Sequence, residues 1–207
     1  MGLRQAASPK TRRNSEWKLI LDDRLDITDL MTGWIHRDNG EWDQLRELFH
    51  PEATIEITWF KGKATDFVNG SMKMGTSDFK TKHLIALPVV TFHGTKAITE
   101  TNAIVVGFNT ALGLGCEAHC RFYDHIEKRD GVWKILERHA IYDMAGFTFP
   151  HGIVELDESA IQKYPIEYAP LAYLLQQSGF PVTSIYPTKG SDLEKTIKAE
   201  GKTWLKA

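Results

Sequence analysis

Apolar side chains recur every three or four positions between residues 19 and 37, which is the spacing of one helix face. The set comprises Leu21, Ile27, Leu30, Met31, Trp34 and Ile35. Asn39-Gly40 follows as a helix stop, so the spacing predicts a helix over residues 19–37. Asp38 ends this apolar stripe, one turn after Trp34, and its position there needs an explanation.

Three shorter elements follow in the pattern. Residues 41–49 predict a short second helix that is ended by Pro51. Apolar side chains alternate with polar ones over residues 53–60, which predicts a strand with one buried face; the apolar positions are Ile55, Ile57 and Trp59. Residues 64–75 predict a third helix, which Gly70 and Gly75 weaken.

Four segments rich in β-forming residues come next, over residues 83–94, 96–108, 116–131 and 132–144. Asp130-Gly131 between the last two is typical of a type I′ hairpin turn. Helices followed by a run of antiparallel strands predict an α+β domain, with helices packed on one face of a curved sheet.

The two ends of the chain differ from this domain. Residues 1–17 lack the apolar core of a signal peptide and are expected to form a disordered lead-in before a domain over 18–149. Residues 150–207 predict a C-terminal extension with helices in 168–182 and 192–207. Its apolar residues indicate packing on the domain or on a second subunit; they include Tyr168, Leu171, Leu174, Leu175 and Trp204.

Composition excludes several classes of partner. The 207 residues are 42% hydrophobic, enough for one sizeable core, and the net charge of -2 gives no electrostatic basis for binding nucleic acid or an anionic membrane. Cys116 and Cys120, if on one strand, lie about 13 Å apart, too far for a disulfide. Reduced thiols favour the cytoplasm. No metal-ligand or phosphate-loop spacing is evident, so no metal and no cofactor are predicted.

Three stretches in order carry a resemblance to a known family: "NGEWDQLRELFHPEATIEI", "TKHLIA" and "YDHIEKRDGVWKILERHAIYD". The chain resembles, over about residues 20–147, the SnoaL-like, scytalone dehydratase-like group of the nuclear-transport-factor-like superfamily. The resemblance implies a cone, in which a curved antiparallel sheet wraps around a deep pocket closed by helices. It also implies a homodimer or higher homo-oligomer. Dehydratases, isomerases, cyclases and noncatalytic binders share this scaffold, so the reaction must be argued from the site.

Asp38 and His83 match the catalytic aspartate and histidine of the dehydratases in this group. Histidine is a suitable base for removing a proton from carbon, and a carboxylate on its other ring N–H fixes the tautomer. Such a neighbour is expected to raise the pKa of His83. In the alternative interpretation, Asp38 only caps the second helix, with Glu41 completing a capping box.

Strand parity and the resemblance together predict a hydrophobic, aromatic pocket. The candidate substrate-binding residues are Trp34, Ile57, Trp59, Asn102, Phe122 and Tyr142. Cys120 shares the inward face with Phe122, whereas His119 and His125 are expected on the outer face. Several of these positions differ from the resembled enzymes: Asn102 and Phe122 replace a histidine and an asparagine, Arg37 and Ile57 replace tyrosines, and Tyr142 and Asp143 occupy the region of an arginine. Asp38 and His83 therefore match the resembled dehydratases, but the residues expected to recognise their substrates do not.

The sequence predicts a cofactor-independent lyase of the dehydratase type, acting on a hydrophobic or polycyclic small molecule, with His83 as base and Asp38 orienting it. An isomerase or cyclase of a polyketide- or terpenoid-like substrate uses the same base. A noncatalytic ligand-binding or oligomerisation module is the rival from another class, and a small subunit of a ring-hydroxylating oxygenase is the weakest alternative.

Overall fold

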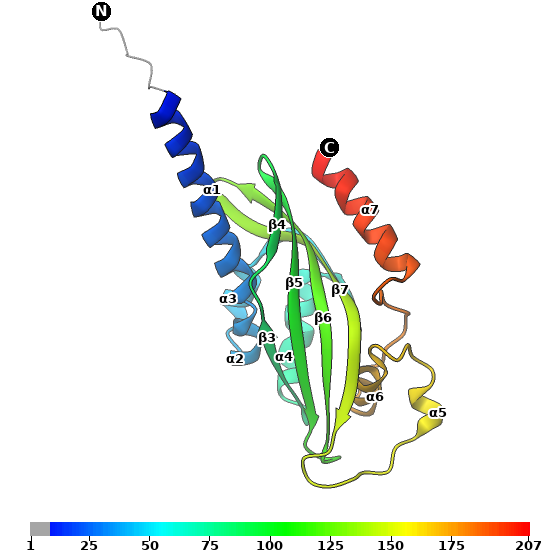
Figure 1. Ribbon diagram of the computed structural model, residues 1–207. Helices are drawn as coiled ribbons and strands as arrows, with labels where there is room; N and C mark the ends of the chain where they lie inside the picture. Colours follow the sequence, from blue (N-terminus) through cyan, green and yellow to red (C-terminus); the bar gives the residue numbers. More distant parts are fainter. Residues whose placement is uncertain (1–8) are drawn as a thin grey trace, which may run out of the picture.

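A strongly curved sheet with helices on both sides forms the body of the protein (Figure 1). The computed structural model describes residues 9–207, with side chains from residue 19 onward. The helices in this range are α1 Pro9–Thr32, α2 Ile35–Asn39, α3 Trp42–Glu47, α4 Ala64–Gly75, α5 Glu158–Ile161, α6 Ala169–Gln177 and α7 Asp192–Lys206.

The sheet explains how distant parts of the chain meet. Its strands are β1 Phe49–Ile57, β2 Phe60–Lys63, β3 Phe79–Ile85, β4 Val89–His93, β5 Lys96–Asn109, β6 Leu114–Arg129 and β7 Val132–Thr148. Their order is β2-β1-β7-β6-β5-β3, and β4 also pairs with β5. All described pairs are antiparallel except β1 with β7, which are parallel. The sheet therefore has β2 and β3 at its two edges. The α+β fold predicted from the sequence is confirmed.

The helix predicted over residues 19–37 is interrupted near its C-terminal end. α1 ends at Thr32, Gly33 and Trp34 form a turn, and α2 begins at Ile35. A Cβ on Gly33 would lie 2.7 Å from Leu48 Cδ2 and 3.2 Å from the backbone oxygens of Asp29 and Leu30, so glycine lets this turn pack closely against Leu48. α1 also begins at Pro9, inside the expected lead-in, while residues 1–8 lie outside the described part.

Two predicted strands are also split. Thr58 and Trp59 form a turn between β1 and β2, so the strand predicted over 53–60 is a hairpin. Residues 86–88 have no strand structure and separate β3 from β4, because Pro88 cannot donate a ladder hydrogen bond. By contrast, α4 covers residues 64–75 as predicted. Asp130 and Gly131 have φ values of 51° and 82°, as a type I′ turn requires.

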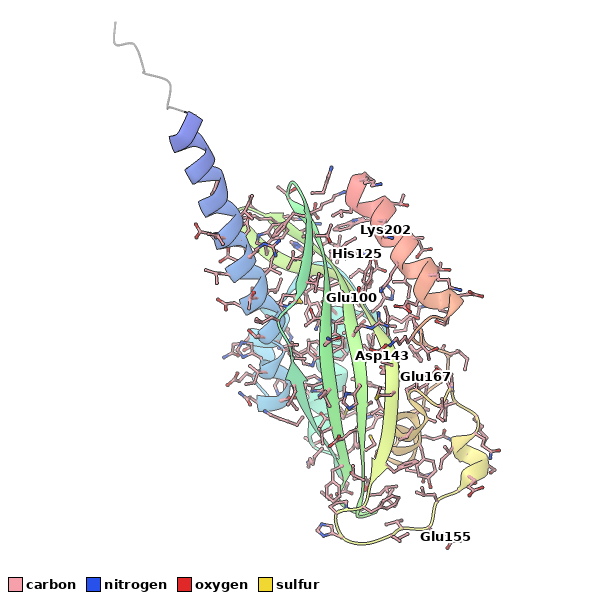
Figure 2. All side chains as sticks on the ribbon, viewed as in Figure 1. Glu100, His125, Asp143, Glu155, Glu167 and Lys202 are labelled. Carbon is pink, nitrogen blue, oxygen red and sulfur yellow. The ribbon has the colours of Figure 1, made fainter. Side chains whose placement is uncertain are left out.

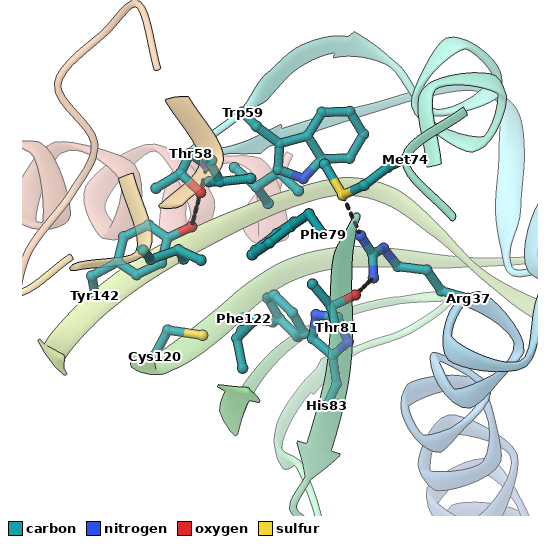
Figure 3. A pocket seen from close by; sticks show the side chains of 14 residues that line it. Arg37, Thr58, Trp59, Met74, Phe79, Thr81, His83, Cys120, Phe122 and Tyr142 are labelled. Carbon is teal, nitrogen blue, oxygen red and sulfur yellow. Dashed lines mark hydrogen bonds between the residues drawn. The ribbon is translucent and has the colours of Figure 1, made fainter. Parts of the chain in front are cut away.

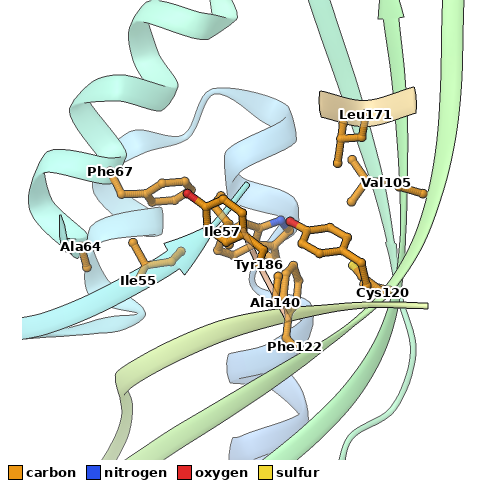
Figure 4. Packing of buried hydrophobic residues seen from close by; sticks show 14 of the residues in the cluster. Ile55, Ile57, Ala64, Phe67, Val105, Cys120, Phe122, Ala140, Leu171 and Tyr186 are labelled. Atoms are coloured by element: carbon orange, nitrogen blue, oxygen red, sulfur yellow. The ribbon is translucent and has the colours of Figure 1, made fainter. Parts of the chain in front are cut away.

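The main core fills the concave side of the sheet. Side chains from the inner face of the strands pack there against α1, α4 and α6 (Figure 4). Cys116, Ala118, Cys120 and Phe122 alternate inward along β6, as strand parity predicts. Leu171, Leu174 and Leu175 bring the C-terminal extension into the same core. The extension thus covers one end of the concave space.

A smaller apolar cluster lies on the convex side, where α7 covers part of the sheet (Figure 2). It consists of Ile98, Tyr123, Ile141 and Leu205. The ring of His125 stacks on Trp204 of α7, with ring centroids 4.6 Å apart. Gly201 makes this contact possible, since a Cβ there would lie 2.7 Å from His125 Nε2. Within residues 9–207, no helix combines the length and apolarity needed to cross a membrane.

Candidate functional site

Asp38 and His83 form a tightly coupled pair at the edge of the sheet. Asp38 belongs to the short helix α2, and His83 belongs to the edge strand β3. His83 Nδ1 lies 2.6 Å from Asp38 Oδ1, and the backbone N–H of His83 donates to Asp38 Oδ2 at 2.7 Å. Both side chains are buried, with 1% of Asp38 and 7% of His83 exposed. The turn at Gly33 and Trp34 separates α2, which carries Asp38, from α1.

Helix capping does not account for Asp38. The N-cap of α3 is Glu41, and no side-chain cap hydrogen bond is formed there. The Glu41 carboxylate instead lies 2.5 Å from His36 Nδ1. Both oxygens of Asp38 are directed to His83, so the capping interpretation is wrong.

The protonation states follow from these contacts. Burial raises the pKa of Asp38, but the hydrogen bonds from His83 and the charge of Arg37 outweigh burial and leave that pKa below its ordinary value. Because the carboxylate is ionised and only accepts hydrogen bonds, Nδ1 of His83 carries the ring proton. Nε2 is then the nitrogen left to act on a ligand.

The expected rise in the pKa of His83 is wrong. Burial lowers this pKa, and the charges of Arg37 and Arg138 add to the effect, so that the raising influence of Asp38 is outweighed. His83 therefore remains neutral at physiological pH. A neutral imidazole with a fixed tautomer is ready to accept a proton.

Arg37 is the second charged group of the site. Its guanidinium donates from Nη1 to Thr81 Oγ1 at 2.7 Å (Figure 3). Nη1 also lies 3.7 Å from Asp38 Oδ1. Nη2 contacts the sulfur of Met74 at 3.3 Å. Burial lowers the pKa of Arg37 to about 10, while Asp38 opposes this shift. The side chain therefore stays positively charged at neutral pH.

Arg37 and His83 border a small apolar cavity (Figure 3). Its lining residues are Arg37, Ile57, Thr58, Trp59, Met74, Phe79, Thr81, His83, Val105, Cys120, Phe122, Tyr142, Leu171 and Leu175. The cavity volume is about 30 Å³, which is room for roughly two water molecules. A larger ligand requires the lining side chains to move. Leu171 and Leu175 come from α6, so the C-terminal extension forms one wall.

Comparison with known proteins shows the family of the chain. The family model of the SnoaL-like domain matches residues 20–139, more than half of the chain. The chain belongs to the SnoaL-like domain family. A curated relative, pea pathogenicity protein 2 of Fusarium vanettenii, is 30% identical over 172 residues, which is 78% of this chain and 72% of that protein.

Solved structures extend the likeness at the level of the fold. The dehydrochlorinase LinA-type3 of Novosphingobium barchaimii, which is named for hexachlorocyclohexane, has a TM-score of 0.54 and 21% identity. That match covers 66% of this chain and 96% of that one. A proposed scytalone dehydratase of Novosphingobium aromaticivorans has a TM-score of 0.51 and 18% identity, covering 68% of this chain and 94% of that one.

The SnoaL-like domain places most of the predicted pocket residues at the cavity. Ile57, Trp59, Phe122 and Tyr142 line it. Trp34 lies behind the lining, where its ring contacts the ring of His83 edge-on, with centroids 5.8 Å apart. Trp34 thus supports the dyad from within the core.

Asn102 is a correction. It is exposed, and its β5 neighbours Thr101 and Ala103 point inward instead. Because successive side chains of a strand alternate between faces, Asn102 lies on the convex side, opposite Arg121 of β6. The prediction that it binds substrate is wrong. An alignment displaced by one residue reverses the face of every side chain in the strand.

A buried ion pair next to the site was missed in the sequence. Arg138 donates from Nε and Nη2 to Asp124 at 2.7 and 2.8 Å, and both side chains are almost fully buried. The guanidinium carbon lies 4.6 Å from the ring centroid of Trp34 and 4.3 Å from that of Phe122. The sequence held one signal of this pair. Arg138 is a charged residue between Ile135 and Ala140, in a strand whose apolar side chains are buried.

Other reactive groups of the SnoaL-like domain are held inactive or apart. Burial raises the pKa of the Cys120 thiol to about 12, so the thiolate is absent at neutral pH. Among the described residues, no group of three or more His, Cys, Asp or Glu side chains is arranged to hold a metal ion. Arg37 and His83 line the cavity together with the hydroxyls of Thr58, Thr81 and Tyr142, and Asp38 contacts His83 outside the lining.

Proposed function

We propose that the protein is a cofactor-independent lyase of the dehydratase type that acts on a hydrophobic small molecule. The supporting observation is the Asp38–His83 pair, in which one ring nitrogen is held at 2.6 Å by the carboxylate. The opposite nitrogen is free to accept a proton from a ligand in the adjoining apolar cavity. Names of structural relatives that denote elimination enzymes support the same reaction class.

The reaction removes a proton and a hydroxide from neighbouring carbons. His83 Nε2 accepts the proton, and Asp38 stabilises the resulting imidazolium. The electron pair of the C–H bond forms the new carbon–carbon double bond, and the C–O bond breaks. The departing hydroxide takes the proton back from His83 as water leaves. The hydroxyl of Tyr142 lines the cavity and donates to Thr58 Oγ1 at 3.2 Å, so it donates to the leaving oxygen only by exchanging that hydrogen bond.

An isomerase or a cyclase starts with the same proton removal, so it remains the nearest alternative. A noncatalytic ligand-binding or oligomerisation module is favoured by one observation, the small cavity of about 30 Å³. That volume is far below the roughly 300–1,000 Å³ of ordinary ligand sites. The module interpretation predicts binding without turnover.

A panel of aromatic β-hydroxy ketones tests the proposal. Elimination of water yields a conjugated ketone, whose ultraviolet absorbance reports turnover directly. His83→Gln and Asp38→Asn are expected to lower kcat by about 10²–10⁴-fold, the usual contribution of an oriented general base. The matched control is His119→Gln, on the opposite face of the sheet. Folded dyad variants that keep wild-type turnover would contradict the mechanism.

A further inference from the structure

Arg37 has hydrogen-bonding capacity that the protein does not use. A guanidinium offers five N–H donors. Among the described residues, its hydrogen-bond acceptors are one hydroxyl, Thr81 Oγ1, and one thioether, Met74 Sδ. Sulfur is a weak acceptor. The Nε atom is buried and has no partner in the described part of the chain. Leaving such a donor unpaired is costly unless a ligand supplies the acceptor.

The charge of Arg37 is also incompletely matched. Both oxygens of Asp38 accept hydrogen bonds from His83 at 2.6 and 2.7 Å. The closest Arg37 nitrogen lies 3.7 Å from Asp38 Oδ1, which is beyond hydrogen-bond distance. Arg138 differs in having a carboxylate of its own, since its Nε and Nη2 both donate to Asp124, although its Nη1 has no partner among the described residues. Arg37 is therefore a cation with spare donors at the wall of an apolar cavity.

We propose that Arg37 binds a negatively charged oxygen of the ligand, so that the substrate is a carbonyl compound whose oxygen becomes an enolate when His83 removes the neighbouring proton. This rests on the proposed lyase function and names its substrate class. An apolar substrate without such an oxygen, such as a hydrocarbon or a haloalkane, leaves the donors of Arg37 unused.

The charges balance for this step. Before reaction, Arg37 and Asp38 carry opposite charges and His83 is neutral. Proton transfer forms a bond between the proton and His83 Nε2, and the C–H electron pair becomes a carbon–carbon double bond as the carbonyl π pair moves to oxygen. The new imidazolium faces Asp38, and the new enolate oxygen faces Arg37. Each developing charge thus has an opposite charge already in place, in a site with little water.

The strand geometry supports this division of roles. Thr81 and His83 both line the cavity, and Thr81 holds the Arg37 guanidinium. Residues two apart on one face of a strand are separated by about 7 Å. Side chains of the length of Arg37 and His83 can therefore reach the oxygen and the adjacent C–H group of one small functional group.

The phenolate of 4-nitrophenol tests the proposal by binding alone, since it carries a delocalised oxyanion like that of an enolate. Its affinity is compared with that of 4-nitroanisole, a neutral molecule of similar shape, and absorbance reports the bound phenolate. Wild-type protein is expected to prefer the phenolate. Arg37→Met is expected to reduce that preference about 10- to 100-fold, the usual loss for a charge-assisted hydrogen bond.

Three variants make the result specific. Lys82→Met removes an exposed cation whose Nζ is 4.0 Å from Asp38 Oδ2 and which does not line the cavity, so the preference should stay at its wild-type level. Arg37→Lys keeps the charge without the fork and should give an intermediate preference. His83→Gln should abolish turnover of the β-hydroxy ketones but retain the preference for the phenolate. Loss of turnover and loss of oxyanion binding are thereby separated.

Several binding results would overturn the proposal that Arg37 binds an oxyanion. Wild-type protein that does not bind the phenolate, or that binds 4-nitroanisole equally well, contradicts a role for Arg37 in oxyanion binding. So does Arg37→Met or Arg37→Lys with an unchanged preference. Thermal melting of every variant is measured first, and Arg37→Lys replaces Arg37→Met in the comparison if the apolar substitution does not fold.

Discussion

The three ionisable residues Asp38, His83 and Arg37 have separate electrostatic tasks at the site. Asp38 is held ionised by its contacts with His83 and Arg37, and His83 is held neutral by burial and by two nearby guanidinium groups. Removing Asp38 should therefore lower the pKa of His83, and removing Arg37 should raise it. Asp38 raises this pKa, whereas Arg37 lowers it.

This division predicts the pH dependence of turnover. We expect kcat/KM to rise with pH through a His83 pKa below its ordinary value of about 6.5, and to fall near pH 10 as Arg37 loses its proton. Asp38→Asn should move the acidic limb to lower pH, and Arg37→Met should move it to higher pH and remove the alkaline limb. Nuclear magnetic resonance titration of the His83 ring checks the same shifts without a substrate. An acidic limb that stays fixed in both variants would count against this electrostatic account.

The buried pair Arg138–Asp124 predicts a large effect on stability. Asp124→Asn leaves a buried guanidinium without its counter-charge, so the free energy of unfolding should fall by about 3–5 kcal/mol. The double variant with Arg138→Met and Asp124→Leu should recover much of this loss, because it removes both charges. Urea denaturation measures both.

The control for this prediction is Arg129→Met, since Arg129 pairs with Glu52 at the exposed surface. It should leave the free energy of unfolding nearly unchanged, because exposed ion pairs contribute little. A loss in Arg129→Met as large as that in Asp124→Asn would show that burial is not what gives the inner pair its importance.

At the scale of single residues, the sequence supplied part of the site. Asp38 stood out because a carboxylate ended an apolar stripe, and His83 was found through the family resemblance. Arg37 lay beside Asp38 in the printed sequence, but only the structure shows that its side chain lines the cavity. The Arg138–Asp124 pair joins neighbouring strands, and local spacing does not reveal such a contact.

At the scale of elements, α7 and the convex face of the sheet depend on one close contact. A Cβ at Gly201 would lie 2.5 Å from the hydroxyl of Tyr123 and 2.7 Å from His125 Nε2. The ring of His125 is fixed by Trp204 and by the carboxylate of Glu137, 2.9 Å away. It therefore cannot yield easily to a new methyl group.

Gly201→Ala is expected to loosen α7. Alanine favours the helix by up to about 1 kcal/mol, but overpacking against fixed rings costs about 1–3 kcal/mol, so the net effect is destabilising. Faster hydrogen exchange in α7 and a lower melting temperature check this. Lys202→Ala, at the next and exposed position, should do neither. Because α7 does not line the cavity, turnover below the melting temperature should be retained.

The element boundaries show which patterns the sequence reveals. α4 and the long strands β5 to β7 were predicted from periodicity and propensity, because each is regular over its length. The interruptions were missed at Gly33, at Thr58 and Trp59, and before Pro88. At Gly33 the interruption brings the backbone close to Leu48, and hydrophobic periodicity carries no record of such a contact. The break before Pro88 has a local cause, the missing N–H of proline.

At the scale of the whole molecule, the titrating groups make stability depend on pH in one direction. His83 stays neutral in the folded protein, so the unfolded chain binds more protons just below about pH 6.5 and stability rises with pH there. The pKa of Glu194 is lowered to about 2, and those of Asp38 and Glu137 are also lowered. Their contribution is complete above their ordinary values and is lost as pH falls toward the folded values.

We therefore expect the free energy of unfolding, measured in urea, to decrease in two stages as the solution is acidified. The first stage follows His83 below about pH 6.5, and the second follows the carboxyl groups below about pH 4.5. His83→Gln should remove the first stage, and Glu137→Gln should reduce the second. Stability that increases on acidification in the wild-type protein would contradict the assigned protonation states.

The backbone hydrogen bond from His83 to Asp38 has a consequence for association. β3 is an edge strand, and exposed edge N–H groups can pair with a strand of another molecule. The Asp38 carboxylate occupies one of these groups and places a negative charge beside it. The residue that orients the proposed base thus also blocks a template for aggregation. Substitutions at Asp38 that remove the carboxylate should shorten the time that concentrated protein remains in solution, whatever happens to catalysis.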